Sequence, residues 1–301
     1  MTHHHHGAES GDVDRRLWAS AALNLGITLV EFAGGILAGS LALLADAAHN
    51  LTDVGALGLA IFARRLGRRA PTPRHTYGLK RAEVVAALIN AAVLIAISVL
   101  IGREAVVRLL HPEPVHATIM LVAAVVALVA NVASVLLLRA HSAGDLNVRS
   151  AFLHLAQDAL ASLAVVVAAL FANTAVGPYV DPAAAVLIGA VVLRSAALII
   201  WESLHTLLEA APPGLSVEEV ARDVSQRFAD VQLHHVHAWE VGPGQRALTA
   251  HMKVNVLTVI EAQAVAAQVR EFLHEHWEIS HVTLEAEANG CGREGLLGDW
   301  K

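Results

Sequence analysis

The chain has 301 residues, of which 55% are hydrophobic and only 16% are charged, and its formal net charge is -6. This composition is too apolar for an ordinary soluble domain, so it predicts a membrane protein. The single cysteine, Cys291, excludes an intrachain disulfide framework and a zinc site built from several cysteines.

Residues 1–14 form a polar tail that contains four consecutive histidines, His3 to His6. These histidines are either a native metal-collecting tail or an expression tag, and neither interpretation bears on the fold. No cleavable signal is expected, because the first apolar run begins only after Arg15 and Arg16.

Residues 15–208 contain six apolar runs of about the twenty residues that a helix needs to cross a bilayer. The runs span residues 17–37, 41–62, 84–101, 117–138, 151–171 and 181–200. We therefore expect an all-α transport domain of six transmembrane helices. The sixth run opens with Asp181 and Pro182, a pair that is typical of a helix N-terminus.

The loop between the second and third runs carries seven lysine or arginine residues between positions 64 and 81, whereas the links at 39–40 and 172–180 carry none. By the positive-inside rule this loop is cytoplasmic, and six spans then place both termini in the cytoplasm. Arg103 and Arg108 fall near the opposite face, where their long side chains are expected to reach the membrane interface.

Polar residues in two of the runs form a repeated pattern. Four of them share one helix face in the second run: Asp46, His49, Asn50 and Asp53. The fifth run repeats a histidine and an aspartate four residues apart, as His154 and Asp158. An ionised aspartate near the bilayer centre costs roughly 3 kcal/mol, so residues of this kind are functional by default.

Two histidines and two aspartates on two helices can supply a tetrahedral shell for zinc. A single His-x-x-x-Asp pair could be an internal hydrogen bond, but its repetition in two membrane helices favours a metal. Six oxygen ligands would favour magnesium or calcium, and sulfur would favour copper(I). The predicted transport site is therefore His49, Asp53, His154 and Asp158.

Other polar residues are expected to support this site or to line its path. Asp46 and Gln157 are candidates for orienting the ligands, and Asp46 is also a candidate for the entry path of the ion. Asn50 shares the face of the ligands without being assigned to the metal. Glu31, in the first run, is either a hydrogen-bonded or protonated group inside the bundle or a proton relay.

The pattern of residues 209–301 predicts a separate soluble domain. The segment 211–214, APPG, breaks the preceding helix, and a capping-box pattern at Ser216 and Glu219 opens a new one. Alternating strands at 233–241 and 247–254, a helix over 260–273 and a last strand at 281–287 follow. The order αββαβ predicts a ferredoxin-like α+β domain with its sheet covered on one face.

The predicted ligands also suggest how transport is driven. Protons compete with a metal ion for histidine and aspartate, so a more acidic outer side favours metal release and proton uptake. We therefore predict zinc export in exchange for protons, with alternating access around one midplane site.

Three alternatives remain open: export of another divalent metal (cadmium, cobalt, manganese, iron or nickel), an intramembrane metalloenzyme, and a membrane-anchored metal sensor. An enzyme would need a base beside the metal, for which Glu31 is the only obvious spare acid. A mere anchor would not need two ligand pairs in its helices.

Several separated motifs together resemble those of one known family. They are ADAAHNLTD at 45–53, RHTYGLKRAE at 74–83, RSAFLHLAQDALAS at 149–162, VDPAAAVLIG at 180–189 and HHVHAWEV at 234–241. In this order they resemble the cation diffusion facilitator family, in its zinc-exporting branch. The resemblance implies a homodimeric metal/proton antiporter with a cytoplasmic metallochaperone-like domain. The short link at 139–150 favours a bacterial-type protein of the cell (inner) membrane. No nucleic acid is expected as a partner.

The resemblance also implies secondary metal sites. Cytoplasmic domains of the family can bind a regulatory metal at the dimer contact, and the matching positions here are His237, His251, Glu285 and Glu287. By strand parity His237 faces away from His251 unless a bulge intervenes. A further site in the loop between the second and third helices is not expected, because Leu79 stands where a second histidine would be.

Overall fold

The computed structural model describes residues 7–139, 146–255, 258–288 and 295–297, with side chains described from residue 23 onwards except at 137–151. The histidines His3 to His6 and the single cysteine, Cys291, lie outside the described residues.

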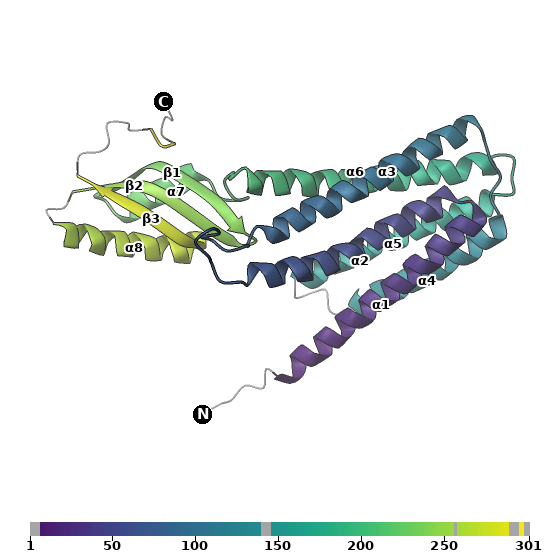
Figure 1. Cartoon of the computed structure of the whole chain (residues 1–301), viewed down its shortest axis with the longest axis horizontal. Coiled ribbons are helices and arrows are strands. Elements are labelled where there is room, and N and C mark those ends of the chain that lie inside the picture. Colours follow the sequence, from purple (N-terminus) through teal and green to yellow (C-terminus); the bar gives the residue numbers. More distant parts are fainter. Residues whose placement is uncertain (1–6, 140–145, 256–257, 289–294, 298–301) are drawn as a thin grey trace. The chain divides into compact units, whose positions relative to one another are not determined.

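Six long helices make up the N-terminal two thirds of the chain (Figure 1). They are α1 (Gly7–Ala38), α2 (Leu41–Gly67), α3 (Ala82–Leu110), α4 (Ala117–Arg139), α5 (Leu146–Phe171) and α6 (Gly177–Leu207). Four of them, α3 to α6, are long and apolar enough to cross a membrane over their described residues, and α1 contributes a shorter apolar segment, Leu23–Ala38. The polar face of α2 lowers its hydropathy. The chain is therefore a multi-pass membrane protein with at least four apolar helices.

The helices bury small residues and expose large ones. Ala42, Ala91 and Ala124 are fully buried, whereas Leu100 and Leu170 are mostly exposed. A soluble bundle would show the opposite pattern, because its large apolar residues would leave water. Small residues at helix contacts and large ones facing outwards are typical of helices packed in lipid.

The described residues divide into two compact units, within the bounds Met1–Gly58 with Ile89–Leu198 and Leu59–Leu88 with Ile199–Lys301. In the first unit α4 packs against both α1 and α5 (Figure 1). Gly34 permits the close approach of α1 to α4, because a Cβ at this position would lie 2.5 Å from the Cβ of Ala123. α4 is therefore a helix that joins α1 and α5 within this unit.

The turn between α1 and α2 is held by a carboxylate from α6. Asp181 accepts hydrogen bonds from the Ser40 hydroxyl and from the backbone N–H groups of Leu41 (2.8 Å) and Ala42 (3.3 Å). The prediction that Asp181 opens the sixth helix is wrong, because α6 already begins at Gly177. Its carboxylate instead caps the N-terminus of α2, whose first N–H groups have no partner within the helix.

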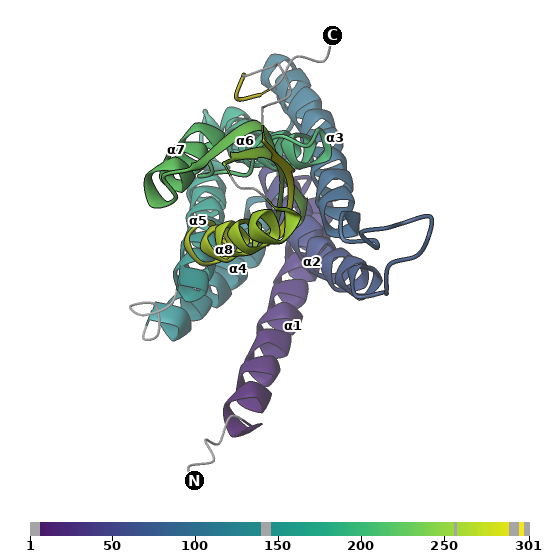
Figure 2. The same cartoon turned by 90° about the vertical axis from the view of Figure 1, so that its left-hand side faces the viewer.

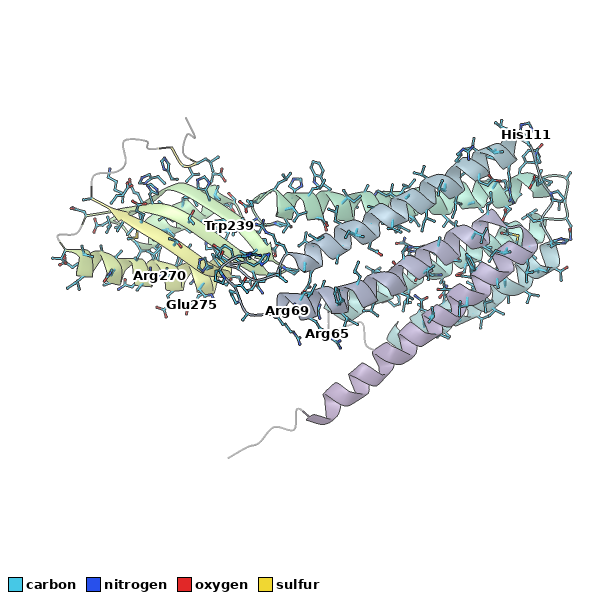
Figure 3. All side chains as sticks on the ribbon, in the orientation of Figure 1. Arg65, Arg69, His111, Trp239, Arg270 and Glu275 are labelled. Carbon is cyan, nitrogen blue, oxygen red and sulfur yellow. The ribbon has the colours of Figure 1, made fainter. Side chains whose placement is uncertain are left out.

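The basic segment after α2 belongs to the second unit. Arg65 and Arg69 are exposed, and their side chains extend away from the ribbon (Figure 3). Arg64 forms a long ion pair with Glu83 (3.9 Å). Most of this positive charge is therefore available to solvent or to lipid headgroups.

The C-terminal domain has the predicted order of elements. It comprises α7 (Val217–Arg227), β1 (Val231–Gly242), β2 (Gln245–Val254), α8 (Val259–Trp277) and β3 (Ile279–Glu287). The strands form one sheet in the order β1-β2-β3, in which β1 and β2 are an antiparallel hairpin and β3 lies parallel to β2 after the crossover through α8. Figure 2 shows the two helices beside the strands.

Both helices cover the same apolar face of the sheet. Val224 of α7 and Leu273 of α8 share one buried cluster with Val236, Leu248 and Met252 of the strands. Because side chains alternate along a strand, the residues between these positions point to the opposite face. The sheet therefore has one apolar face under the helices and one polar face.

The cap on α2 predicts a measurable effect on stability. Asp181→Ala leaves two backbone N–H groups and a hydroxyl without an acceptor, so we expect the free energy of unfolding to fall by about 1–3 kcal/mol. Thermal unfolding in detergent, followed by circular dichroism, measures the loss as a lower midpoint. Asp181→Asn keeps one acceptor oxygen and should lose less, and Asp230→Ala, at an exposed position, is the control. An unchanged midpoint for Asp181→Ala would contradict the capping role.

Candidate metal centre

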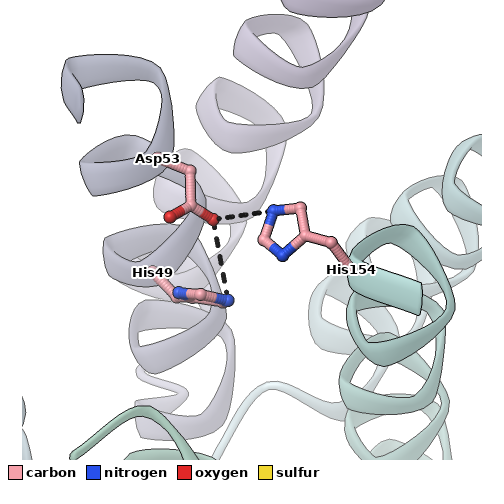
Figure 4. A group of neighbouring side chains, drawn as sticks. All are labelled: His49, Asp53 and His154. Atoms are coloured by element: carbon pink, nitrogen blue, oxygen red, sulfur yellow. Dashed lines mark ion pairs between the residues drawn. The ribbon is translucent and has the colours of Figure 1, made fainter. Parts of the chain in front are cut away.

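The structure brings the four predicted ligands together between α2 and α5. Figure 4 shows His49 and Asp53 on α2 facing His154 on α5. The Asp53 carboxylate lies 3.3 Å from Nε2 of His154 and 3.6 Å from Nε2 of His49. Asp158 lies 3.6 Å from Nε2 of His49 and 3.8 Å from Nε2 of His154. Each carboxylate therefore contacts both imidazoles.

These distances suit a small divalent cation. In a tetrahedral zinc shell with metal–ligand bonds of about 2.0 Å, the ligand atoms lie about 3.3 Å from one another. The four histidine–carboxylate separations in the structure, 3.3–3.8 Å, are close to that value. One ligand atom from each of His49, Asp53 and His154 lies within 4.8 Å of the other two. Asp158 is not part of this group of three, and its two oxygens each approach a different imidazole, so the fourth side chain must shift before all four can surround one ion.

Several ligand atoms are buried without a hydrogen-bond donor or acceptor. They include both oxygens of Asp158, one oxygen of Asp53 and both ring nitrogens of His49. Leaving such atoms unpaired in an apolar environment costs several kcal/mol, and a cation is one of the few partners that could satisfy them together. The donor set therefore fits a metal better than it fits a structural contact.

Exposure of the ligands changes along the helices. The side chains of Asp53 and His154 are 27% and 45% exposed, whereas those of His49 and Asp158 are 10% and 1% exposed. Asp53 lies toward the Gly67 end of α2, and His154 lies toward the Leu146 end of α5. The site is therefore more exposed toward the Gly67 end of α2 and more buried toward the Leu41 end.

A polar network surrounds the buried half of the site. The Asn131 amide of α4 donates to the Ser162 hydroxyl (3.0 Å), which donates to Asp46 (3.2 Å). Asn50 donates to Glu31 of α1 (2.8 Å). Asp46 is thus linked to α4 and α5, and Asn50 is linked to Glu31 of α1.

One predicted supporting residue stands apart, and one was missed. Gln157 is partly buried, and among the described side chains it makes no hydrogen bond or ion pair with the four ligands. Ser162 was not singled out from the sequence, although its position, one helical turn after Asp158, places it on the ligand face. That spacing was the signal that could have found it.

A second cluster of metal-ligating residues lies on the polar face of the C-terminal sheet. Nε2 of His234 is 3.1 Å from Glu287, and Nδ1 of His251 is 2.7 Å from the same carboxylate. Glu285 lies 3.7 Å from Nε2 of His251. One ligand atom from each of His234, His251 and Glu287 lies within 4.8 Å of the others, so these three residues could hold a metal ion.

His234 takes the place in this cluster that was expected for His237. A bulge between the two residues, with His235 at a positive φ of 48°, shifts the register of β1. His234 then pairs with His251, and His237 pairs with Thr249 on the same face. The bulge therefore removes the parity conflict of His237, yet it puts His234 directly opposite His251.

A bundle of apolar helices that brings two histidines and two aspartates close together is typical of an integral membrane protein that handles cations. Residues 17–208 match the cation efflux transmembrane domain, and residues 212–289 match the cytoplasmic domain of cation efflux proteins. The chain belongs to this cation efflux family, also called cation diffusion facilitators, as its motifs suggested.

Similar proteins include the zinc transporter ZitB of Pectobacterium atrosepticum, 39% identical over 97% of this chain and 90% of the relative. ZitB of Escherichia coli strain K12 is 40% identical, over 92% of this chain and 88% of the relative. A Bacillus velezensis protein named cadmium, cobalt and zinc/H(+)-K(+) antiporter is 33% identical, over 98% and 95%.

The register of β1 yields a prediction that separates two histidines. We expect His234→Ala to weaken zinc binding to the C-terminal domain at least about tenfold, since even residues that only orient metal ligands are worth about 10–100-fold. His237→Ala is the matched control, because His237 lies on the same strand just after the bulge. It should change the affinity by less than about twofold. Calorimetry with zinc on residues 209–301, which contain their own buried core, measures both. The reverse ranking would show that the bulge does not decide the ligand set.

Proposed function

We propose that this protein exports zinc from the cytoplasm in exchange for protons, by alternating access around His49, Asp53, His154 and Asp158. The observation that carries the proposal is the cluster of these four side chains, with buried atoms that lack hydrogen-bond partners, inside apolar helices. An ionisable cluster of this kind within a membrane is typical of an ion pathway.

Zinc is the favoured cargo. Two imidazoles and two carboxylates form a tetrahedral shell of the kind that zinc prefers, and relatives at 39–40% identity are named zinc transporters. The name of the Bacillus velezensis relative adds cadmium and cobalt, so other divalent metals are the nearest alternative cargo. The protein is a transporter and not an enzyme, and neither the metalloenzyme nor the sensor interpretation gains support.

Competition between zinc and protons supplies the driving force. A metal-bound imidazole is neutral and a metal-bound aspartate is ionised, so zinc binding displaces protons and protonation releases zinc. A more acidic outer side therefore promotes release of zinc there. Zinc that binds on the cytoplasmic side is thus exchanged for protons, and the proton gradient supplies the energy.

The exposure of the ligands suggests which side the site faces. The basic segment, with Arg65 and Arg69, is cytoplasmic by the positive-inside rule. Asp53 and His154, which lie toward that end of their helices, are the more exposed ligands. We assign the structure to a cytoplasm-facing state of an inner-membrane protein in which α1 and α2 also span the bilayer and both termini are cytoplasmic.

The C-terminal domain is assigned a regulatory and dimerising role. We place the boundary of the six-helix transport domain at residues 15–208 and that of the cytoplasmic domain at 209–301. A hairpin followed by a helical crossover is consistent with a reduced ferredoxin-like, metallochaperone-like fold. Zinc at His234, His251 and Glu287, with Glu285 beside them, would act as regulatory ligand in a homodimer.

Flux through sealed liposomes tests the transport proposal. With an imposed pH gradient, the purified protein should move zinc into the lumen, and Asp158→Ala should reduce this flux to that of protein-free liposomes, because it removes a buried ligand with two unpaired oxygens. A zinc-sensitive dye inside the liposomes measures the flux. Asp230→Ala, at an exposed position far along the chain, should transport like the wild type.

The assay also has outcomes that refute the proposal. Zinc flux that ignores both the gradient and Asp158→Ala would exclude antiport through this site. Parallel runs with manganese, cobalt, cadmium and iron(II) determine the cargo, and a preference for any of them over zinc would correct the metal while leaving the site in place.

A further inference from the structure

Glu31 is a fully buried acid that the four-ligand site does not use. It lies on α1, and its side chain has no exposed surface. One carboxylate oxygen accepts a hydrogen bond from the Asn50 amide (2.8 Å), and the other has no donor. An acid in this state is either protonated or strongly destabilised.

A second buried acid lies beside it. Asp46 of α2 is 1% exposed, and its carboxyl group lies within hydrogen-bonding reach of that of Glu31. Ser162 donates to one oxygen of Asp46, and the other oxygen has no donor. Each of the two buried carboxyl groups thus keeps one oxygen without a donor.

Among the described side chains, the charged groups that act on Glu31 are acidic, while His49 lies near its partner Asp46. α2 contributes Asp46, and α5 contributes Asp158 at longer range. The described stretch of α4, which packs against α1, contains no acidic or basic residue between positions 117 and 136. Two carboxylates so close together cannot both be ionised at low cost, and a proton on one of them supplies the missing donor for the other.

We propose that Glu31, paired with Asp46, is a proton-binding site separate from the four metal ligands, and that it carries a proton exchanged for zinc. This inference rests on the proposed function and adds a residue to it. The proton-loaded form is a carboxylic acid that donates to the neighbouring carboxylate. The proton-free form has an ionised Glu31 held by the Asn50 amide.

The position of the pair couples it to the metal. Asp46 precedes His49 by three residues on α2, so the two side chains are neighbours on one helix face. Arrival of a divalent cation favours ionised carboxyl groups nearby, and the acid of Glu31 releases its proton to the cytoplasm as zinc binds. Departure of zinc on the outer side restores the affinity for a proton, which is then taken up from that side.

A polar stripe on α1 offers the proton a route. Asn24, Thr28 and Glu31 are spaced by four and three residues, so they share one helix face. Thr28 is 2% exposed, and Asn24, nearer the N-terminal end of the helix, is partly exposed. The stripe therefore runs from the buried acid toward the end of α1 that we assign to the cytoplasm.

Substitutions of Glu31 separate a proton site from a structural acid. Glu31→Gln has nearly the same shape but cannot exchange a proton, whereas Glu31→Asp keeps an acid. In sealed liposomes, E31Q should exchange zinc for zinc at the wild-type rate without a pH gradient. It should lose both the acceleration by a pH gradient and the proton movement that a pH-sensitive dye reports. E31D should retain part of both, and Glu113→Gln, at an exposed acid, should match the wild type.

Infrared difference spectra test the protonation itself. Between acidic and alkaline buffer the wild-type protein should show the carbonyl band of a carboxylic acid, and E31Q should lack a component of this band. Proton movement per zinc that is unchanged in E31Q, or an unchanged band, overturns the proposal and leaves zinc export standing. Loss of zinc-for-zinc exchange in E31Q also overturns it, because Glu31 would then be needed to move the metal. A wild-type protein that moves no zinc at all refutes the proposed function instead. In that case the infrared spectra alone test whether Glu31 binds a proton.

Discussion

The structure depends on one constraint: ionisable side chains inside apolar helices must find partners that neither lipid nor water provides. Asp158 has two buried oxygens without donors, and His49 has two such nitrogens. Each would cost several kcal/mol if it stayed unpaired. Much of the membrane unit serves to hold these atoms in place. Asp181 fixes the start of α2, and Gly34 lets α1 approach α4.

The sequence predicted which four side chains cluster, because within each of the two helices their placement depends on local helix geometry. A histidine and an aspartate four residues apart must share a helix face, and two such pairs in one membrane domain have few other reasons to exist. What the sequence could not supply was the packing between helices. Asp46 was expected to support the site, but its partners Ser162 and Asn131 follow from how α4 and α5 meet α2. Asp181 shows the same limit, since its partners lie about 140 positions away.

In the C-terminal domain, the order of elements was predictable, and the details of the polar face were not. From Leu248 to Val254, alternation along the strand gives the buried residues of β2 directly, because nothing interrupts the period of two there. In β1 the bulge after His234 breaks that period. A positive φ at His235 is unusual for a residue with a side chain. The motif HHVH contains no glycine from which the bulge could be predicted. The parity argument therefore turned His237 away from His251, although the bulge leaves both His234 and His237 on the polar face, and it gave no sign that His234 lies opposite His251.

The two ends of the metal site are held differently, and this asymmetry bears on alternating access. At the more buried end, Asp181 ties α2 to α6, so opening there requires that these two helices move together or that the cap breaks. The Ser162–Asp46 hydrogen bond links α5 to α2 on the same side of the ligands. Hydrogen bonds to an ionised acceptor are about twice as strong as neutral ones, so this link weakens when Asp46 shares a proton with Glu31. In the proposed cycle the strength of this contact therefore changes with the proton, which is taken up after zinc has left.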